Sequence, residues 1–137
     1  MKRTDEAVNS FKNGLNCSQA LLSAFSEDLG LDKETAAKIA SGFGGGMGCT
    51  GETCGAVTGA VMVIGLKHGK SGKATAFSRE LMERFRDRNG FVTCRALLEC
   101  DISTEEGMAK ARRDNLFSSR CPKFVEDAAG IVEELVK

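Results

Sequence analysis

The sequence predicts an all-α fold, a single compact bundle of about six or seven helices with a glycine-rich loop. Apolar residues recur at the spacing of an amphipathic helix, and no stretch shows the sustained alternation of a half-buried strand. Residues that favour helix ends stand beside these periodic segments. The chain has 137 residues and no evident linker or repeat, so residues 1–137 are expected to form one all-helical domain.

The helical segments follow one another with short connections. They are expected over residues 4–11, 17–29, 33–41, 54–68, 73–88, 94–100 and 104–115, with a closing helix from residue 122. Gly30 and the Asn-Gly pairs at 13–14 and 89–90 are helix stop signals. Each segment therefore has a recognisable beginning or end.

Several of these segments are preceded by a residue that can cap a helix. Asn16, with Gln19 three residues later, predicts a capping box. Ser103 with Glu106 predicts a second one. Because Pro is favoured at the first helical position, Pro122 places the preceding residue at an N-cap. The remaining predicted N-caps are Asp32, Thr53, Thr93 and Cys121.

The glycine-rich stretch over residues 41–59 reads SGFGGGMGCTGETCGAVTG. Glycine accepts positive φ angles and lets other groups approach the backbone closely. Cys49 lies inside the stretch, and Cys54 stands where it passes into the next helix. The run follows a helix rather than a strand and lacks the GK[ST] ending of a phosphate loop, so nucleotide binding has little support.

Small residues repeat every four positions at the start of the helix after this stretch. Gly55 and Gly59 form one such pair, and Ala56 and Ala60 form the other. Such a ridge permits a close helix–helix crossing. Gly55 also directly follows Cys54, where bare backbone would admit a cofactor or a partner sulfur.

The composition excludes several classes of function. The formal net charge is zero and Trp and Tyr are absent, which argues against nucleic-acid binding. The N-terminal residues lack the apolar core of a signal peptide, and the longest apolar run, residues 60–66, is too short to span a bilayer. We therefore expect a cytoplasmic protein without membrane insertion. A single His, His68, gives acid–base catalysis little support and is expected to cap the end of its own helix.

Six cysteines are many for such a chain, and in a reducing compartment they favour metal ligation or redox chemistry. Four of them are predicted to stand at helix starts, where backbone N–H groups and the helix dipole stabilise thiolates. These four, which we expect to converge, are Cys17, Cys54, Cys94 and Cys121. Cys54 is the candidate redox thiolate, with Glu52 either tuning it or facing water. The alternative is that the cysteines are small buried hydrophobic residues.

Cys49 and Cys100 lie away from the predicted helix starts. They are either resolving thiols for Cys54 and Cys94 or incidental. No CxxC pair is present, which weakens a zinc-finger interpretation without excluding a site assembled by the fold.

The ordered cysteines and the CGAVTG segment at residues 54–59 resemble the redox-active family named for its C-GCAxxG-C-C pattern. The resemblance covers nearly the whole chain and implies a small redox-active protein, often encoded near transporter genes. It assigns the family cysteines to Cys17, Cys54, Cys94 and Cys121, with Gly55, Ala56 and Gly59 completing a cofactor-binding motif. The family is also similar to the cluster-bearing part of split-Soret cytochromes. The chain has no CxxCH, so we expect no covalent haem.

Three functions remain open from the sequence. The first is electron transfer through an iron–sulfur cluster or another thiolate-bound metal, and the second is thiol–disulfide exchange with Cys54 as the attacking thiolate. The third, from another class, is a non-catalytic structural or interaction protein with a zinc-bound or buried cysteine cluster. The redox partner, the substrate and the oligomeric state, with a homodimer among the options, are left open.

Overall fold

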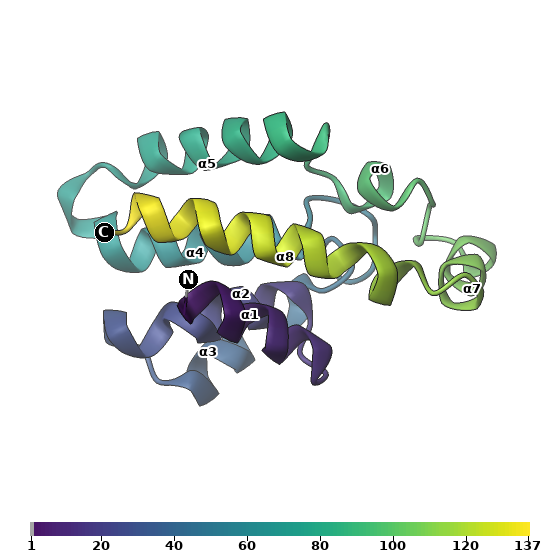
Figure 1. Ribbon diagram of the computed structural model, residues 1–137, viewed down its shortest axis with the longest axis horizontal. Helices are drawn as coiled ribbons and strands as arrows, with labels where there is room; N and C mark the ends of the chain where they lie inside the picture. Colours follow the sequence, from purple (N-terminus) through teal and green to yellow (C-terminus); the bar gives the residue numbers. More distant parts are fainter. Residues whose placement is uncertain (1) are drawn as a thin grey trace.

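The computed structural model describes residues 2–137, which form eight α-helices and no strand, confirming the all-α fold (Figure 1). The eight helices correspond one to one with the eight segments expected from the sequence, although the bundle was expected to have about six or seven helices. In chain order the helices are α1 (Lys2–Lys12), α2 (Cys17–Ser26), α3 (Lys33–Ala40), α4 (Gly55–His68), α5 (Ala74–Asn89), α6 (Cys94–Leu98), α7 (Glu105–Arg113) and α8 (Leu116–Leu135).

Helices α4 and α8 form the centre of the bundle and pack against each other. Helix α5 lies on one side of this pair, and α1, α2 and α3 lie on the other (Figure 1). Fully buried aliphatic and aromatic side chains fill the space between these layers: Leu21, Leu22, Val57, Val63, Ile64, Leu81, Phe85, Val125, Ile131 and Val132. Within residues 2–137, none of the helices combines the length and the apolar character needed to cross a bilayer.

The small-residue ridge of α4 lies against α2, as predicted. A Cβ atom on Gly59 would lie 2.7 Å from Leu21 Cβ and 2.8 Å from the carbonyl oxygen of Ser18. A Cβ atom on Gly55 would lie 3.0 Å from the backbone nitrogen of Ser18. These separations are too short for a methyl group, so the absence of side chains at both positions sets how closely the two helices approach.

His68 joins three helices at the end of α4. Its Nε2–H donates to the carbonyl oxygen of Leu135 in α8 at 2.8 Å, and its ring stacks on Phe77 of α5 with centroids 4.2 Å apart. His68 therefore caps the last turn of α8 instead of its own helix.

Two predicted helix starts are displaced by one residue. Cys54 is the N-cap of α4, which begins at Gly55, whereas the sequence predicted Thr53 as the cap. Thr53 is extended because it pairs with Thr93 in an isolated antiparallel bridge. Thr104 caps α7 in place of Ser103, and its hydroxyl oxygen accepts from the backbone N–H of Gly107 at 2.9 Å.

The predicted start of the closing helix at Pro122 is wrong. Cys121 and Pro122 lie in the second turn of α8, which already begins at Leu116. Asn115 has a φ of 54° and redirects the chain there, and Leu116 and Phe117 then pack as half-buried residues against the core. The fixed φ of proline suits a helix, and its cost is one missing backbone hydrogen bond.

The glycine-rich loop over residues 44–51 turns in the left-handed sense. Five consecutive residues have positive φ: Gly45 (64°), Gly46 (71°), Met47 (66°), Gly48 (62°) and Cys49 (60°). Three of the five are glycines, for which this conformation carries no steric penalty from a Cβ atom. The loop therefore folds back on itself.

Candidate functional site

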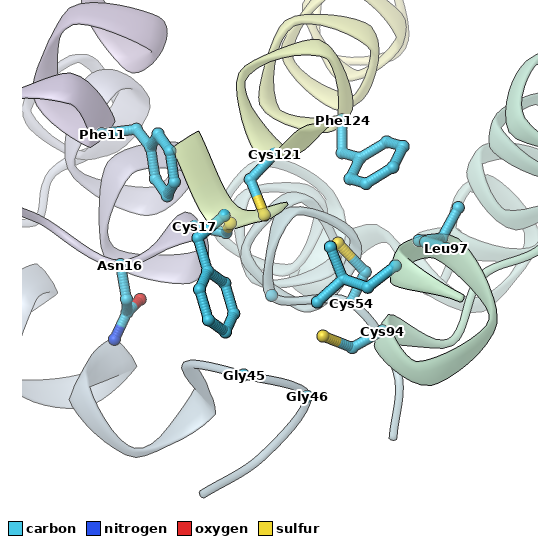
Figure 2. A pocket seen from close by; sticks show the side chains of 13 residues that line it. Phe11, Asn16, Cys17, Gly45, Gly46, Cys54, Cys94, Leu97, Cys121 and Phe124 are labelled. Atoms are coloured by element: carbon cyan, nitrogen blue, oxygen red, sulfur yellow. The ribbon is translucent and has the colours of Figure 1, made fainter. Parts of the chain in front are cut away.

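Four cysteines line one cavity of about 190 Å³. Figure 2 shows the sulfurs of Cys17, Cys54, Cys94 and Cys121 directed toward the same space. The structure thus brings together the four thiols that the sequence singled out. The remaining lining residues are Phe11, Asn16, Gly45, Gly46, Gly55, Leu97, Leu98, Phe117 and Phe124.

Each of the four cysteines comes from a different helix. Cys17 is the first residue of α2, where Asn16 forms the predicted capping box. Cys54 is the N-cap of α4, and Cys94 is the first residue of α6 after the N-cap Thr93. Cys121 comes from the second turn of α8 and is not at a helix start. The helix dipole argument therefore applies to three of the four thiols.

The backbones of Cys54 and Cys94 are joined directly. The N–H of Cys54 donates to the carbonyl oxygen of Val92 at 2.8 Å, and the N–H of Cys94 donates to that of Glu52 at 2.7 Å. These two bonds flank the antiparallel bridge between the segments that precede α4 and α6. The relative position of these two cysteines is thus set by the main chain.

Hydrogen bonds between the cavity thiols shift the pKa values of Cys17 and Cys54 in opposite directions. Bonds to Cys121 and to Cys54, together with burial, raise the pKa of Cys17 well above its ordinary value. The bond from Cys17 lowers the pKa of Cys54, and the N–H groups of Ala56 and Val57 at the start of α4 act in the same direction. Among these thiols, Cys54 is the one that the surroundings favour as the anion.

Cys94 is held in its neutral form. Burial raises the pKa of this thiol to about 12, and the nearby Cys54 and Cys121 add to the effect. A helix start alone therefore does not make a thiolate here, because desolvation outweighs the dipole.

The approach to Cys54 is closed. Cys54 is 3% exposed, Cys121 is 5% exposed and Cys94 is 7% exposed, whereas Cys17 is half-buried. The glycines before Cys54 had also suggested an open approach to its thiol, and this burial contradicts that expectation. Gly45 and Gly46, which we call the glycine wall, instead cover one side of the cavity (Figure 2).

The glycine wall is in close contact with the cysteine segments. A Cβ atom on Gly46 would lie 2.5 Å from the carbonyl oxygen of Glu52 and 2.9 Å from Cys94 Cβ. A Cβ atom on Gly45 would lie 2.7 Å from Cys49 Sγ. Only glycine fits at Gly46, so the backbone itself closes the cavity beside Cys94.

The motif residues after Cys54 have different positions. Gly55 lines the cavity, and a role for it beside a cofactor stays a prediction. Ala56 is fully buried outside the lining, and Gly59 lies against α2. The contacts of Gly59 are those of a helix-packing residue.

The two additional cysteines lie outside the cavity. Cys49 is exposed on the glycine-rich loop, and Cys100 is buried with its thiol donating to the carbonyl oxygen of Gly107 at 3.1 Å. Glu52 faces the exterior, where its carboxylate is 3.9 Å from a guanidinium nitrogen of Arg95. None of the three contributes a side chain to the lining.

Several lining residues were missed from the sequence. Phe11, Phe117 and Phe124 line the cavity but were not recognised as site residues. Asn16 was identified as a cap but not as part of the cavity wall. The phenylalanines recur at the spacing of apolar residues on any helix that faces the core. Periodicity alone therefore cannot distinguish a residue that lines a cavity from one that is packed in the core.

The donor set has a clear chemical preference. Four sulfur ligands in an apolar cavity suit iron–sulfur clusters and other soft metal centres. Among residues 2–137, no three His, Cys, Asp or Glu side chains are grouped so as to hold one metal ion. The cavity that the cysteines line has a volume of about 190 Å³, which would leave room for a centre of several atoms.

A protein-family model described as "Putative redox-active protein (C_GCAxxG_C_C)" matches residues 15–135. No curated protein and no solved structure matches the chain. The matched segment contains all four cavity cysteines and the glycine wall.

Proposed function

The chain belongs to the C_GCAxxG_C_C family of redox-active proteins, and we propose that it transfers electrons through an iron–sulfur centre held by its cavity cysteines. One observation carries the proposal: four helices each direct one cysteine into the same cavity. The ligands would be Cys17, Cys54, Cys94 and Cys121. Such a centre would supply reversible one-electron chemistry, with a potential that depends on burial and on hydrogen bonds to sulfur.

The cavity walls support this proposal because they are largely apolar and offer little competing polarity. Leu97, Leu98, Phe117 and Phe124 provide apolar surface, and Gly55 and the glycine wall expose backbone close to the sulfurs. A thiol must lose its proton to ligate a metal, and the lowered pKa of Cys54 makes that loss easier. The raised pKa values of Cys17 and Cys94 belong to the metal-free protein, where no cation compensates for burial.

Cys17 is the only half-buried residue among the four cavity cysteines. The other three are 7% exposed or less. A redox partner would therefore approach nearest to the centre at Cys17, beside the start of α2.

Thiol–disulfide exchange is the second candidate, and the hydrogen bond between Cys17 and Cys54 favours it. In exchange, the thiolate of Cys54 would attack a disulfide of the oxidant and release one thiol. Cys17 would then displace the second thiol and leave a Cys17–Cys54 disulfide. The difficulty is access, because Cys54 is buried and the pKa of Cys17, the least buried residue of the four, is raised.

Anaerobic reconstitution with ferrous iron and sulfide tests the two candidates together. We expect a brown protein with stoichiometric iron and acid-labile sulfide, and with a reversible one-electron couple in a potentiometric titration. A colourless protein without bound iron, in which two thiols oxidise together to one disulfide, would overturn the proposal in favour of exchange. Tight zinc binding without redox activity would indicate the structural role.

A further inference from the structure

The glycine wall is held in place from outside the cavity by α6. Two chains of backbone hydrogen bonds connect α6 to the glycine wall, one through Gly51 and the other through Glu52. In the first, the N–H of Arg95 donates to the carbonyl oxygen of Gly51 at 3.0 Å, and the N–H of Gly51 donates to that of Gly45 at 3.0 Å. In the second, the N–H of Cys94 donates to the carbonyl oxygen of Glu52 at 2.7 Å, and the N–H of Glu52 donates to the carbonyl oxygen of Gly46 at 3.0 Å.

The side chain of Arg95 adds a third connection on the exposed surface. Its Nη2 donates to the carbonyl oxygen of Thr50 at 2.9 Å, and its Nε donates to Asp101 Oδ1 at 3.4 Å. The same guanidinium is 3.9 Å from Glu52 Oε2. One planar side chain thus joins the end of the glycine-rich loop to the segment that follows α6.

The backbone conformation at Gly51 leaves room for this side chain. Gly51 has a φ of 77°, and a Cβ atom there would lie 3.2 Å from Arg95 Cβ and 3.3 Å from its Nε. The guanidinium therefore lies directly over the loop backbone. The Asp101 carboxylate also accepts hydrogen bonds from the backbone N–H and the hydroxyl of Ser103. These bonds and the charge of Arg95 lower its pKa.

We propose that Arg95 is a positioning residue that holds the glycine wall closed over Cys54 and Cys94. It touches none of the four sulfurs and acts through residues 50–52. Its importance for electron transfer rests on the proposed function, but its effect on the wall does not. The same contacts exist in the metal-free protein.

The test measures the accessibility of each thiol in reduced, metal-free protein. Iodoacetamide labelling is followed by peptide mass spectrometry in the wild type and in Arg95→Ala. We expect Cys54 and Cys94 to label about tenfold faster in the variant, since a hydrogen bond from a charged donor contributes roughly that factor to local closure. Cys100 follows α6 and precedes Asp101, so its labelling reports local loosening of that segment, and an unchanged circular dichroism spectrum excludes global unfolding.

Two further variants separate positioning from a general loosening of α6. Arg120 donates to the carbonyl oxygen of Leu98 at 3.0 Å, at the opposite end of α6, so Arg120→Ala is the matched control. It should leave the labelling of Cys54 and Cys94 unchanged. Arg95→Lys keeps the charge but cannot reach Thr50 and Asp101 in the same planar geometry, so an intermediate rate is expected.

The proposal is overturned if Arg95→Ala labels like the wild type, or if Arg120→Ala accelerates labelling equally. If Arg95→Ala does not fold, the labelling rates of Cys54 and Cys94 in Arg95→Lys decide. Rates equal to those of the wild type in that variant would also overturn the proposal. Iron reconstitution of the wild type is read separately. Failure to bind iron would remove the proposed function and leave the labelling result intact, whereas unchanged labelling would remove only the role of Arg95.

Discussion

The thiols of Cys17 and Cys54 share a hydrogen bond that affects the two sulfurs in opposite directions. It lowers the pKa of Cys54 and, after the bond to Cys121, is the next cause of the raised pKa of Cys17. The half-buried thiol is therefore the donor, and the buried one is the acceptor. The pair therefore makes Cys54 easier to ionise than burial alone would allow.

This relationship predicts opposite results for two substitutions of Cys17. Cys17→Ala removes the donor, so the pKa of Cys54 should rise, because burial then opposes the anion against the amides of Ala56 and Val57 alone. Cys17→Ser keeps a hydrogen-bond donor, so the pKa of Cys54 should remain lowered in this variant. The pH profile of Cys54 labelling in reduced, metal-free protein measures both. An unchanged profile in Cys17→Ala would show that the amides of Ala56 and Val57 lower the pKa of Cys54 without help from Cys17.

The neutral thiol of Cys94 predicts a loss of stability in alkali. Its pKa is about 12 in the folded protein against an ordinary value of 9.0. Below pH 9 both states are protonated and no stability is lost. As the pH rises from 9 toward 12, the unfolded state ionises first, so the free energy of unfolding falls by roughly 1 kcal/mol at pH 10 from this group.

Urea unfolding of the metal-free protein between pH 8 and pH 10.5 measures this slope. The free energy of unfolding of Cys94→Ala should fall less steeply with pH than that of the wild type over that range. Some slope should remain, because the pKa of Cys17 is also raised. Equal slopes in the two proteins would contradict the assignment to Cys94.

Two glycines of α4 predict opposite changes in stability. A Cβ atom on Gly59 would lie 2.7 Å from Leu21 Cβ, so Gly59→Ala should destabilise the protein by about 1–3 kcal/mol through overpacking. Gly65 lies in the same helix with nothing within 4 Å of such an atom. Gly65→Ala should therefore stabilise by about 0.5–1 kcal/mol. Chemical denaturation followed by circular dichroism measures both, and destabilisation by Gly65→Ala would contradict the packing argument.

Local signals predicted much of the fold from the sequence. The capping box at Asn16 and Gln19 begins α2 as expected, with both reciprocal hydrogen bonds present. Thr93 caps α6 through a bond from the N–H of Ala96. These features depend on residues only three positions apart, so they can be recognised without tertiary information.

The errors arose where distant segments decide the local structure. Thr53 looks like an N-cap, but its pairing with Thr93 extends the chain and moves that position to Cys54. Pro122 suits a first turn, yet burial of Leu116 and Phe117 extends α8 in front of it. Each signal was compatible with two structures, and packing chose between them.

The candidate site shows the same division. The spacing of the cysteines and the helix starts indicated which thiols line one cavity, but not that Cys54 is buried or that the glycine wall lines the same cavity. The wall depends on backbone bonds such as that from Glu52 to Gly46, which join residues in a left-handed turn. Glycine content alone is equally compatible with an open loop and a closed one.

A panel of cysteine substitutions tests which sulfurs bind the proposed centre. Single replacement by serine of a cavity cysteine, with Cys94→Ser as the most informative case, should abolish or greatly reduce the iron and sulfide retained after anaerobic reconstitution. Cys49→Ser and Cys100→Ser are matched controls, because both cysteines lie outside the cavity lining. They should retain wild-type iron, sulfide and visible absorption.

Cys94→Ser separates the ligand role from reactivity. The thiol of Cys94 is neutral and 7% exposed in the metal-free protein, so it is the weakest candidate for a nucleophile. If the cysteines act by thiol–disulfide exchange between Cys17 and Cys54, Cys94→Ser should keep its redox activity. If they bind a centre, that variant should lose iron as completely as Cys54→Ser does. Full iron retention in Cys94→Ser would therefore remove Cys94 from the ligand set and leave only three cavity thiols to hold the metal.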